Sequence, residues 1–328
     1  ATVNGLLMSM RLLHELHMTY FHMNSSNTNT SNAFSEVTLT AGKGRLSVGA
    51  KGLSLTPSVA GCPASRATGE PFWSLTLEPD TVPAAQGEAV VITSLRQDAA
   101  RREALPDGGA RLVYERLTDG GRVFRIGLTL EFHASGDGFT VTGAVTHEAR
   151  GWLLTGFTGP VLNGIGADLA DSPALLPEGF GKRINRVPAP GEEQGGWQRL
   201  GDGYETGVAY PCAHGTMQWF ALAGRKGGLY VGSHDPLHRA KRLSLRYDPA
   251  TKRFGMAVRH DFFCRSGESV ELAPVVLRPY AGTRHVAARL YRAWFNTVGR
   301  LREGPAWVRG ISGWLLAILK QQNGEIMW

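Results

Sequence analysis

The chain has 328 residues, of which 42% are hydrophobic and 19% charged, so it is long enough to bury one large core or two smaller ones. Its net charge of +7 comes from scattered Lys and Arg, without a basic stripe or a recognisable module, which argues against a nucleic-acid partner. The 42 glycines and 17 prolines predict many turns between short strands and fall short of a low-complexity composition.

The amino-terminal stretch, residues 1–35, is expected to be a poorly ordered or short helical leader followed by a polar linker at residues 24–32. Charged residues and histidines interrupt its apolar positions, so it lacks the apolar core of a signal peptide. The sequence contains no run of about 20 apolar residues, which predicts no membrane partner. The missing export signal favours the cytoplasm, although an incomplete amino terminus would look the same.

From residue 37 onward apolar and polar residues alternate, which is the pattern of half-buried strands. Val37 and Leu39 face Leu46 and Val48 across the turn at residues 41–44, which predicts a hairpin. Further strands are predicted at residues 72–77, 89–93, 110–117, 122–132 and 139–146. Because one face of each strand is apolar, we expect a second sheet to cover it.

Between residues 151 and 203 the sequence is rich in glycine and proline, and we expect long loops with isolated strand pieces, such as residues 152–157. Regular strands are predicted to resume at residues 217–222, 229–233, 243–247, 254–258 and 270–277. The predicted fold class of residues 36–280 is therefore mainly β, a large antiparallel β-supersandwich.

A helix is predicted after Thr283, because Val286 and Leu290 begin an apolar stripe at helical spacing that ends before Gly299. Residues 281–304 would connect the sandwich to the last part of the chain.

The chain closes with an unbroken apolar run at residues 314–319, which suits a strand buried on both faces of a parallel sheet. Polar residues follow it: Lys320, Gln321, Gln322, Asn323 and Glu325. In barrel enzymes the chemistry lies at the carboxyl ends of such strands, and a (β/α)8 barrel needs about 250 residues. Residues 305–328 are therefore expected to be the start of a truncated barrel.

Three segments in the second half of the chain carry a resemblance to a known family. They are Y-P at 210–211 with M-Q-W-F-A-L at 217–222 and G-L-Y-V-G-S-H-D-P at 228–236, L-Y-R-A-W-F at 290–295, and P-A-W at 305–307 leading to K-Q-Q-N-G-E at 320–325. Together they resemble the amino-terminal half of a bacterial barrel glycosidase of the α-galactosidase type. The resemblance implies a galactose-mutarotase-like supersandwich followed by a (β/α)8 barrel, with the rest of that barrel as its partner. It also implies that the catalytic carboxylates lie on later barrel strands, outside this chain.

The resemblance implies a carbohydrate substrate, and the polar residues at the end of the chain are its first candidate contacts. Lys320, Gln321, Gln322 and Asn323 could hydrogen-bond to sugar hydroxyls, and Glu325 would lie near the mouth of the barrel. The alternative for these side chains is capping of a helix, hydrogen bonding within a loop or, for Glu325, a solvated charge.

His234, Asp235 and Trp197 are further candidates for substrate binding. With Pro236 next, His234 and Asp235 are expected to begin a turn in which Asp235 accepts hydrogen bonds from nearby backbone amides, or to line the sugar site. Trp197 follows two glycines and is expected to be exposed and able to stack on a sugar ring, whereas most tryptophans in strands are core residues.

The sequence predicts neither a metal site nor a cofactor. Cys62, Cys212 and Cys264 have no CxxC spacing, and His234 and His238 lie in a predicted loop without a third ligand. No phosphate-binding glycine motif and no G-x-S-x-G nucleophile motif occurs.

The leading hypothesis is the non-catalytic amino-terminal sandwich of a glycoside hydrolase that acts on an oligosaccharide or glycoconjugate. The alternative is a carbohydrate-binding or structural β-sandwich module. A third possibility is an aldose epimerase, for which His214 or His234 would have to work with Glu205 or Glu268 on one face of a sheet.

Overall fold

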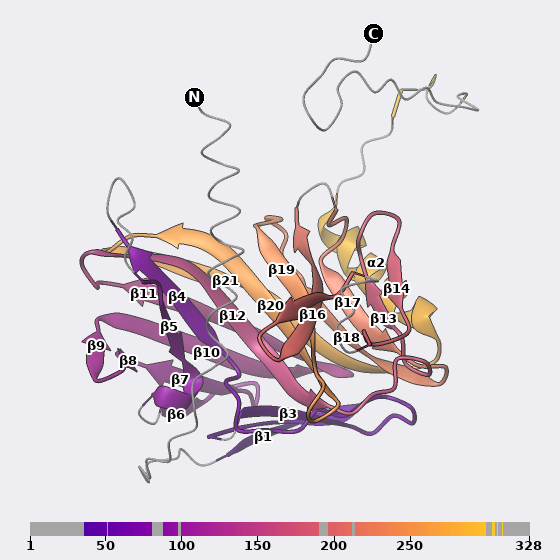
Figure 1. Cartoon of the computed structure of the whole chain (residues 1–328), viewed down its shortest axis with the longest axis horizontal. Helices are drawn as coiled ribbons and strands as arrows, with labels where there is room; N and C mark the ends of the chain where they lie inside the picture. Colours follow the sequence, from indigo (N-terminus) through magenta and orange to yellow (C-terminus); the bar gives the residue numbers. More distant parts are fainter. Residues whose placement is uncertain are drawn as a thin grey trace.

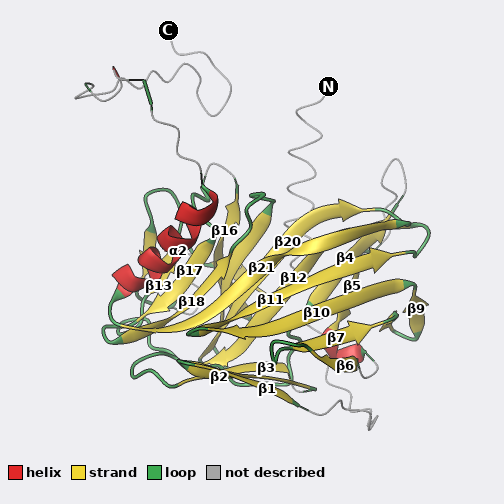
Figure 2. Cartoon of the chain, turned by 180° about the vertical axis from the view of Figure 1, so that it is seen from behind, coloured by secondary structure: helices red, strands yellow, loops and turns green. Residues whose placement is uncertain are grey.

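The computed structural model describes residues 36–50, 52–80, 88–97, 100–189, 196–211, 214–299, 304, 305, 307 and 310. Over these residues the chain is mainly β, and its strand pairs are antiparallel. Two large sheets are stacked face to face, and a small sheet lies along one edge (Figures 1 and 2). The predicted antiparallel sandwich is thus confirmed.

The larger sheet has nine strands and faces the viewer in Figure 2. In spatial order they are β14 (Lys182–Ile184), β13 (Ala174–Leu176), β17 (Trp219–Ala223), β18 (Gly227–Ser233), β21 (Glu268–Ala281), β11 (Gly138–His147), β10 (Ile126–Ser135), β7 (Ala110–Tyr114) and β6 (Arg101–Ala104).

The second sheet has seven strands and faces the viewer in Figure 1. In spatial order they are β15 (Gln198–Leu200), β16 (Gly203–Tyr210), β19 (Lys241–Asp248), β20 (Arg253–Cys264), β12 (Trp152–Ile165), β4 (Ser74–Pro79) and β5 (Val90–Thr93). The remaining elements are the sheet β1 (Val37–Ala41), β2 (Gly44–Gly49) and β3 (Gly52–Pro57), the hairpin β8 (Leu117–Asp119) and β9 (Arg122–Phe124), the short 3-10 helix η1 (Ser94–Arg96) and the helix α2 (Arg284–Val298).

The core follows from the alternation in the sequence. In β10 the side chains of Ile126, Leu128, Leu130 and Phe132 are at most 2% exposed, while the residues between them are half-buried. The first hairpin pairs Val37 with Val48 and Leu39 with Leu46, as predicted. These residues belong to one continuous apolar cluster that both large sheets share.

The segment between residues 151 and 203 differs from the prediction. Instead of long loops it contains β13, β14, β15 and a 14-residue strand, β12, whose central residues are almost all buried. Strand β16 follows at once and was also not predicted. The glycines of β12 are a consequence of close packing, because a Cβ at Gly156 would lie 2.9 Å from the backbone oxygen of His260 on β20.

Helix α2 lies on the outer face of the nine-stranded sheet, across β17 and β18 (Figure 2). It begins after Thr283 and ends before Gly299, as predicted, although the Thr283 side chain does not cap it. Tyr291 packs there on the outward side chains of Trp219 and Tyr230, whereas Phe220 and Val231 point into the core. Strands β17 and β18 are therefore buried on both faces.

The apolar run predicted to start a barrel, residues 314–319, lies outside the described residues. No described helix has both the length and the hydrophobicity needed to cross a membrane.

Candidate functional site

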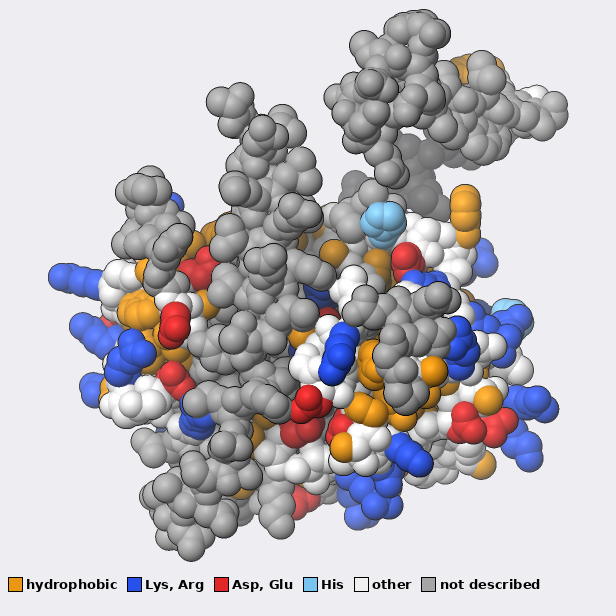
Figure 3. Space-filling view, viewed as in Figure 1, with side chains coloured by type: hydrophobic (Ala, Val, Ile, Leu, Met, Phe, Trp, Pro, Cys, Tyr) orange, Lys and Arg blue, Asp and Glu red, His pale blue; other side chains and the backbone are white. Residues whose placement is uncertain are grey.

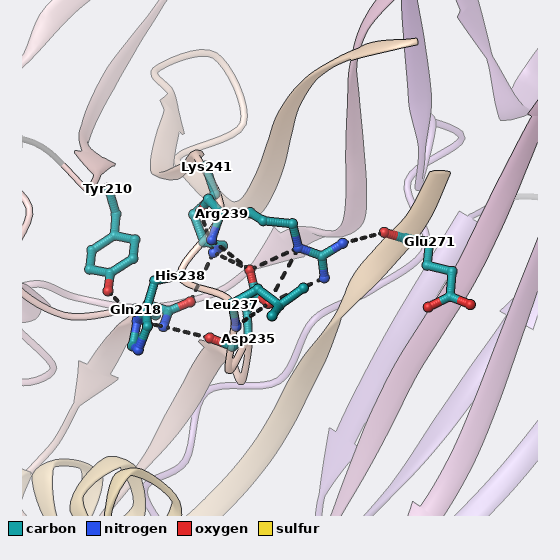
Figure 4. Close-up of polar contacts among 8 residues, drawn as sticks. All are labelled: Tyr210, Gln218, Asp235, Leu237, His238, Arg239, Lys241 and Glu271. Atoms are coloured by element: carbon teal, nitrogen blue, oxygen red, sulfur yellow. Dashed lines mark hydrogen bonds and ion pairs between the residues drawn. The ribbon is translucent and has the colours of Figure 1, made fainter. Parts of the chain in front are cut away.

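The loop that follows β18 holds a buried carboxylate, Asp235 (Figure 4). Asp235 accepts hydrogen bonds from the backbone amides of Leu237 at 3.1 Å and Arg239 at 2.9 Å, so the predicted turn is confirmed. The Arg239 guanidinium also lies against the carboxylate, with Nε 3.2 Å from Oδ2, and reaches across to the backbone oxygen of Glu271 at 2.6 Å. The turn is thus tied to β21.

Lys241, the first residue of β19, is the second buried charge. The alternation of β19 places Lys241 on the same side as Leu243 and Leu245, and its side chain is fully buried. Its Nζ donates to Asp235 Oδ2 at 3.0 Å, to Gln218 Oε1 at 2.8 Å and to the backbone oxygen of Arg239 at 2.5 Å. All three ammonium donors therefore have acceptors.

The surroundings of Asp235 keep it ionised. Burial alone would raise the pKa of its carboxyl, but the hydrogen bonds from Arg239 and Lys241 outweigh this and hold the pKa well below its usual range. Burial lowers the pKa of Lys241, and the bond to Asp235 opposes that shift. A carboxylate that is saturated with donors in this way is suited to fixing a loop and unsuited to donating a proton.

The Gln218 side chain bridges Lys241 and His238 by hydrogen bonds. Because an ammonium only donates, Gln218 Oε1 faces Lys241, and its Nε2 donates to the Asp235 backbone oxygen at 3.1 Å and to His238 Nδ1 at 3.0 Å. Tyr210 Oη lies 2.6 Å from the same Nδ1. Nδ1 is therefore the acceptor, which places the proton of neutral His238 on Nε2. His238 also has a left-handed backbone, with φ of 53°.

His234 turns the opposite way, toward helix α2. Its ring stacks on Trp294 at 4.7 Å between centroids, and its Nε2 is 2.9 Å from Tyr230 Oη. Burial, helped by the charge of Arg278, lowers the pKa of His234 to about 4. His234 is therefore a neutral aromatic residue of the contact between α2 and the sheet, and adjacent Asp235 does not share its surroundings.

A groove of about 1610 Å³ runs along the outer face of the seven-stranded sheet. Tyr210 and Lys241 line it, so the buried network borders on the groove. Seven basic and six acidic residues line it, together with aromatic residues. Figure 3 shows this face, and where described residues are visible, charges of both signs are interspersed with apolar side chains. The groove suits a ligand that is polar but carries little net charge.

The floor of the groove contains charged side chains that pair with one another. Arg259 donates to Asp261 Oδ1 at 2.7 Å and to Thr76 Oγ1 at 3.0 Å. Glu205 accepts from Arg246 at 2.9 Å and from Ser244 at 3.2 Å. The Arg259–Asp261 pair lies within β20, whereas the Arg259–Thr76 bond joins β20 to β4 and the bonds to Glu205 join β19 to β16.

Trp197 is buried and 2% exposed, so the expectation of an exposed tryptophan is wrong. Its indole donates to the backbone oxygen of Arg186 at 3.2 Å and packs edge-on against Tyr247. The two preceding glycines do not expose it, because β15 begins at the next residue and joins the seven-stranded sheet. Trp197 lines the end of the groove as a packing residue, and its contact with a sugar stays a prediction.

The structure brings together some of the predicted residues and not others. His234 and Asp235 lie in one turn but serve two separate clusters, and Trp197 belongs to β15 and its surroundings. Lys320, Gln321, Gln322, Asn323 and Glu325 lie outside the described residues, so their predicted roles stay predictions. Of the residues considered for an epimerase, Glu205 accepts hydrogen bonds from Arg246 and Ser244, Glu268 accepts one from the Arg265 backbone amide, and His234 contacts Tyr230 and Trp294.

Gln218, Lys241 and Arg259 were not identified from the sequence. A signal existed for Lys241, because the pattern K-R-L-S-L at residues 241–245 puts a lysine on the apolar side of a strand. Across the described part of the chain, no group of three or more His, Cys, Asp and Glu side chains is arranged to hold a metal ion. Cys264 is buried, and Cys62 is half-buried with its thiol donating to the Gly228 backbone oxygen at 3.0 Å.

Comparison with known proteins gives matches to solved structures alone. No protein-family model matches the sequence, and no curated protein does. An α-N-acetylgalactosaminidase from Bifidobacterium bifidum, solved with GalNAc, is similar at a TM-score of 0.54 and 15% identity, over 81% of this chain and 40% of that chain.

Two further structures are similar at lower TM-scores. A GH36 α-galactosidase from Geobacillus stearothermophilus has a TM-score of 0.49 and 12% identity, over 85% of this chain and 44% of that chain. A putative aldose 1-epimerase from Escherichia coli K12 has a TM-score of 0.44 and 14% identity, over 75% of this chain and 99% of that chain.

The structural neighbours include galactosidase-type enzymes, as the sequence resemblance predicts, and the first match establishes the fold. The chain spans about two fifths of the length of that α-N-acetylgalactosaminidase, with 40% of it covered.

Proposed function

We propose that this chain is the non-catalytic β-sandwich part of a glycoside hydrolase that acts on an oligosaccharide or glycoconjugate. The observation that carries the proposal is the fold, since 81% of the chain matches two fifths of an α-N-acetylgalactosaminidase (40% of that chain). The remainder of such an enzyme would hold the catalytic carboxylates. On this proposal the apolar run at residues 314–319 begins the barrel, and the polar residues after it lie at its mouth.

The arrangement of the buried carboxylates supports a non-catalytic sandwich. Glycoside hydrolysis usually needs one carboxyl kept protonated and a second carboxylate across the scissile bond. Asp235 is held ionised by Arg239 and Lys241, and Glu205 is bonded to Arg246 and Ser244. Asp235 is therefore not available as a proton donor, and Glu205 already accepts hydrogen bonds from two side chains.

The test is hydrolysis of 4-nitrophenyl α-galactoside and 4-nitrophenyl N-acetyl-α-galactosaminide by residues 1–328 and by a polypeptide that continues past Trp328 in the same reading frame. We expect no turnover by the shorter chain and turnover by the longer one. Turnover by residues 1–328 would contradict the proposal. Glu70, which lines the groove and whose pKa is raised by partial desolvation there, would then be the first carboxyl to substitute.

A carbohydrate-binding module is the second candidate, and the groove on the seven-stranded sheet favours it. This candidate needs no barrel and predicts saturable sugar binding by the chain alone. Trp197→Ala is a poor probe of that binding, because Trp197 is buried and its loss would disturb the packing of β15.

A further inference from the structure

One part of the groove floor has hydrogen-bonding capacity that the protein does not use. Arg259 is 8% exposed and lies across β12 at Gly156, where an added Cβ would be 2.6 Å from Arg259 Nη2. Its Nε donates to Asp261 and its Nη1 to Thr76. A guanidinium has five N–H donors, so several have no partner among the described residues.

Thr155 lies beside this arginine at an irregularity in the sheet. Leu154 pairs with Cys264 and Gly156 with Asp261, so two residues of β20 oppose the single residue Thr155. On the other side β4 has no residue opposite Thr155 at all. Bulges of this kind re-aim side chains and are frequent near functional sites.

The Thr155 hydroxyl is an unexplained buried polar group. Thr155 is 5% exposed, it lines the groove, and its Oγ1 has no hydrogen-bond partner among the described residues. Buried hydroxyls in folded proteins are nearly always bonded, so one without a partner in a groove indicates a missing water or ligand.

Acceptors and apolar surface lie close by. Asp261 uses Oδ1 for Arg259, and its side chain is 41% exposed. Trp152 and Phe263 line the same groove, and Phe263 is 76% exposed. Donors, an acceptor and aromatic faces together are what a sugar ring requires, since its hydroxyls form hydrogen bonds and its C–H face packs on apolar surface.

We propose that Thr155, Arg259 and Asp261 form a subsite that binds a pair of adjacent hydroxyls of a neutral saccharide without chemical turnover. Arg259 donates hydrogen bonds to the oxygens of the two saccharide hydroxyls, and Asp261 accepts a hydrogen bond from one of them. The Thr155 hydroxyl, which has no partner in the described part of the free protein, hydrogen-bonds to the saccharide. The near balance of seven basic and six acidic residues around the groove disfavours a strongly anionic ligand. The proposal rests on the proposed function for its ligand class, but the subsite lies on the sandwich and needs no barrel.

The experiment is titration of residues 1–328 with lactose, methyl α-galactoside and N-acetylgalactosamine, followed by NMR or calorimetry, with polygalacturonate as the anionic probe. We expect saturable binding of at least one neutral probe. Thr155→Val has nearly the same shape, and we expect it to weaken this binding about tenfold, the loss of roughly one hydrogen bond. Asp261→Asn should also weaken it.

Thr206→Val is the matched control. The Thr206 hydroxyl is also buried without a partner in the described chain, at 3% exposure, but Thr206 does not line the groove. Removing an unbonded hydroxyl should leave folding intact in both valine variants, and Thr206→Val should bind as the parent does. Polarimetry of freshly dissolved galactose should show no acceleration by the chain.

Three results would overturn the subsite: no saturable binding of any neutral probe, equal binding by Thr155→Val and the parent, or tighter binding of polygalacturonate. Accelerated mutarotation would overturn binding without turnover. Each is independent of hydrolysis by the longer polypeptide, so failure of the subsite and failure of the proposed glycosidase can be told apart.

Discussion

Asp235 and Lys241 hold opposite charges where neither side chain is exposed, and the loop geometry depends on both. Such a pair contributes little net stability compared with apolar residues of similar shape, but losing one partner leaves the other charge buried and unpaired. In Asp235→Asn, Lys241 would keep Gln218 and a backbone oxygen as acceptors but no counter-charge from Asp235. We predict a loss of about 3–5 kcal/mol in the free energy of unfolding, measured by urea denaturation.

Asp137→Asn is the matched control for Asp235→Asn. Asp137 also pairs with two cations, Lys43 at 2.7 Å and Arg278 at 3.2 Å, but its side chain is 35% exposed. Exposed pairs are worth about 1 kcal/mol or less. Equal effects of the two substitutions would show that the buried network does not hold the loop.

The contact between helix α2 and the nine-stranded sheet depends on the neutral form of His234. Its pKa is lowered to about 4, whereas an unperturbed histidine has a pKa of about 6.5. At pH values between these two pKa values, His234 is protonated in the unfolded chain and neutral in the folded chain. We therefore predict that the free energy of unfolding falls as pH drops from about 6.5 toward 4, by up to roughly 1.4 kcal/mol per pH unit for this group.

His234→Gln should reduce that pH dependence, and chemical denaturation at pH 7.5, 6.0 and 5.0 measures it. Some dependence should remain, because burial and the charges of Lys241 and Arg239 lower the pKa of His260 to about 3. His285→Gln, on the exposed side of α2, should leave the parent slope unchanged. A slope in His234→Gln equal to that of the parent would rule out His234 as its source.

At the scale of the elements, the sequence was sufficient to predict a strand wherever one face of that strand is buried and the other is not. The alternation of β10 and the hairpin of β1 and β2 are examples, and the register of that hairpin was predicted as well. Strand β12 was missed beyond its first residues because it is buried on both faces and carries Gly156, Gly159 and Gly164, which look like loop residues. Periodicity cannot distinguish such a strand from a glycine-rich loop.

At the scale of the whole molecule, the sequence predicted the sandwich and one half of the buried network. The Asp235 turn was predicted because turn chemistry is local. Its partners lie outside that turn, since Gln218 immediately precedes β17 and Lys241 is the first residue of β19. The groove could not be predicted, because Thr155, Arg259 and Asp261 meet only through the register between β12 and β20. Local sequence patterns predict individual strands and turns, whereas the groove residues are brought together by the pairing of strands that are distant in the sequence.

The two large sheets share one apolar cluster, so we predict that the described sandwich unfolds as a single cooperative unit. Leu130 of β10 and Leu245 of β19 lie in different sheets and are 2% and 1% exposed. Leu130→Ala and Leu245→Ala should each cost about 2–5 kcal/mol and shift one common transition, seen alike by tryptophan fluorescence and far-UV circular dichroism. Val123→Ala, at a position 61% exposed, should shift it little. Two separable transitions, each responding to one of the leucine variants, would mean that the sheets fold independently.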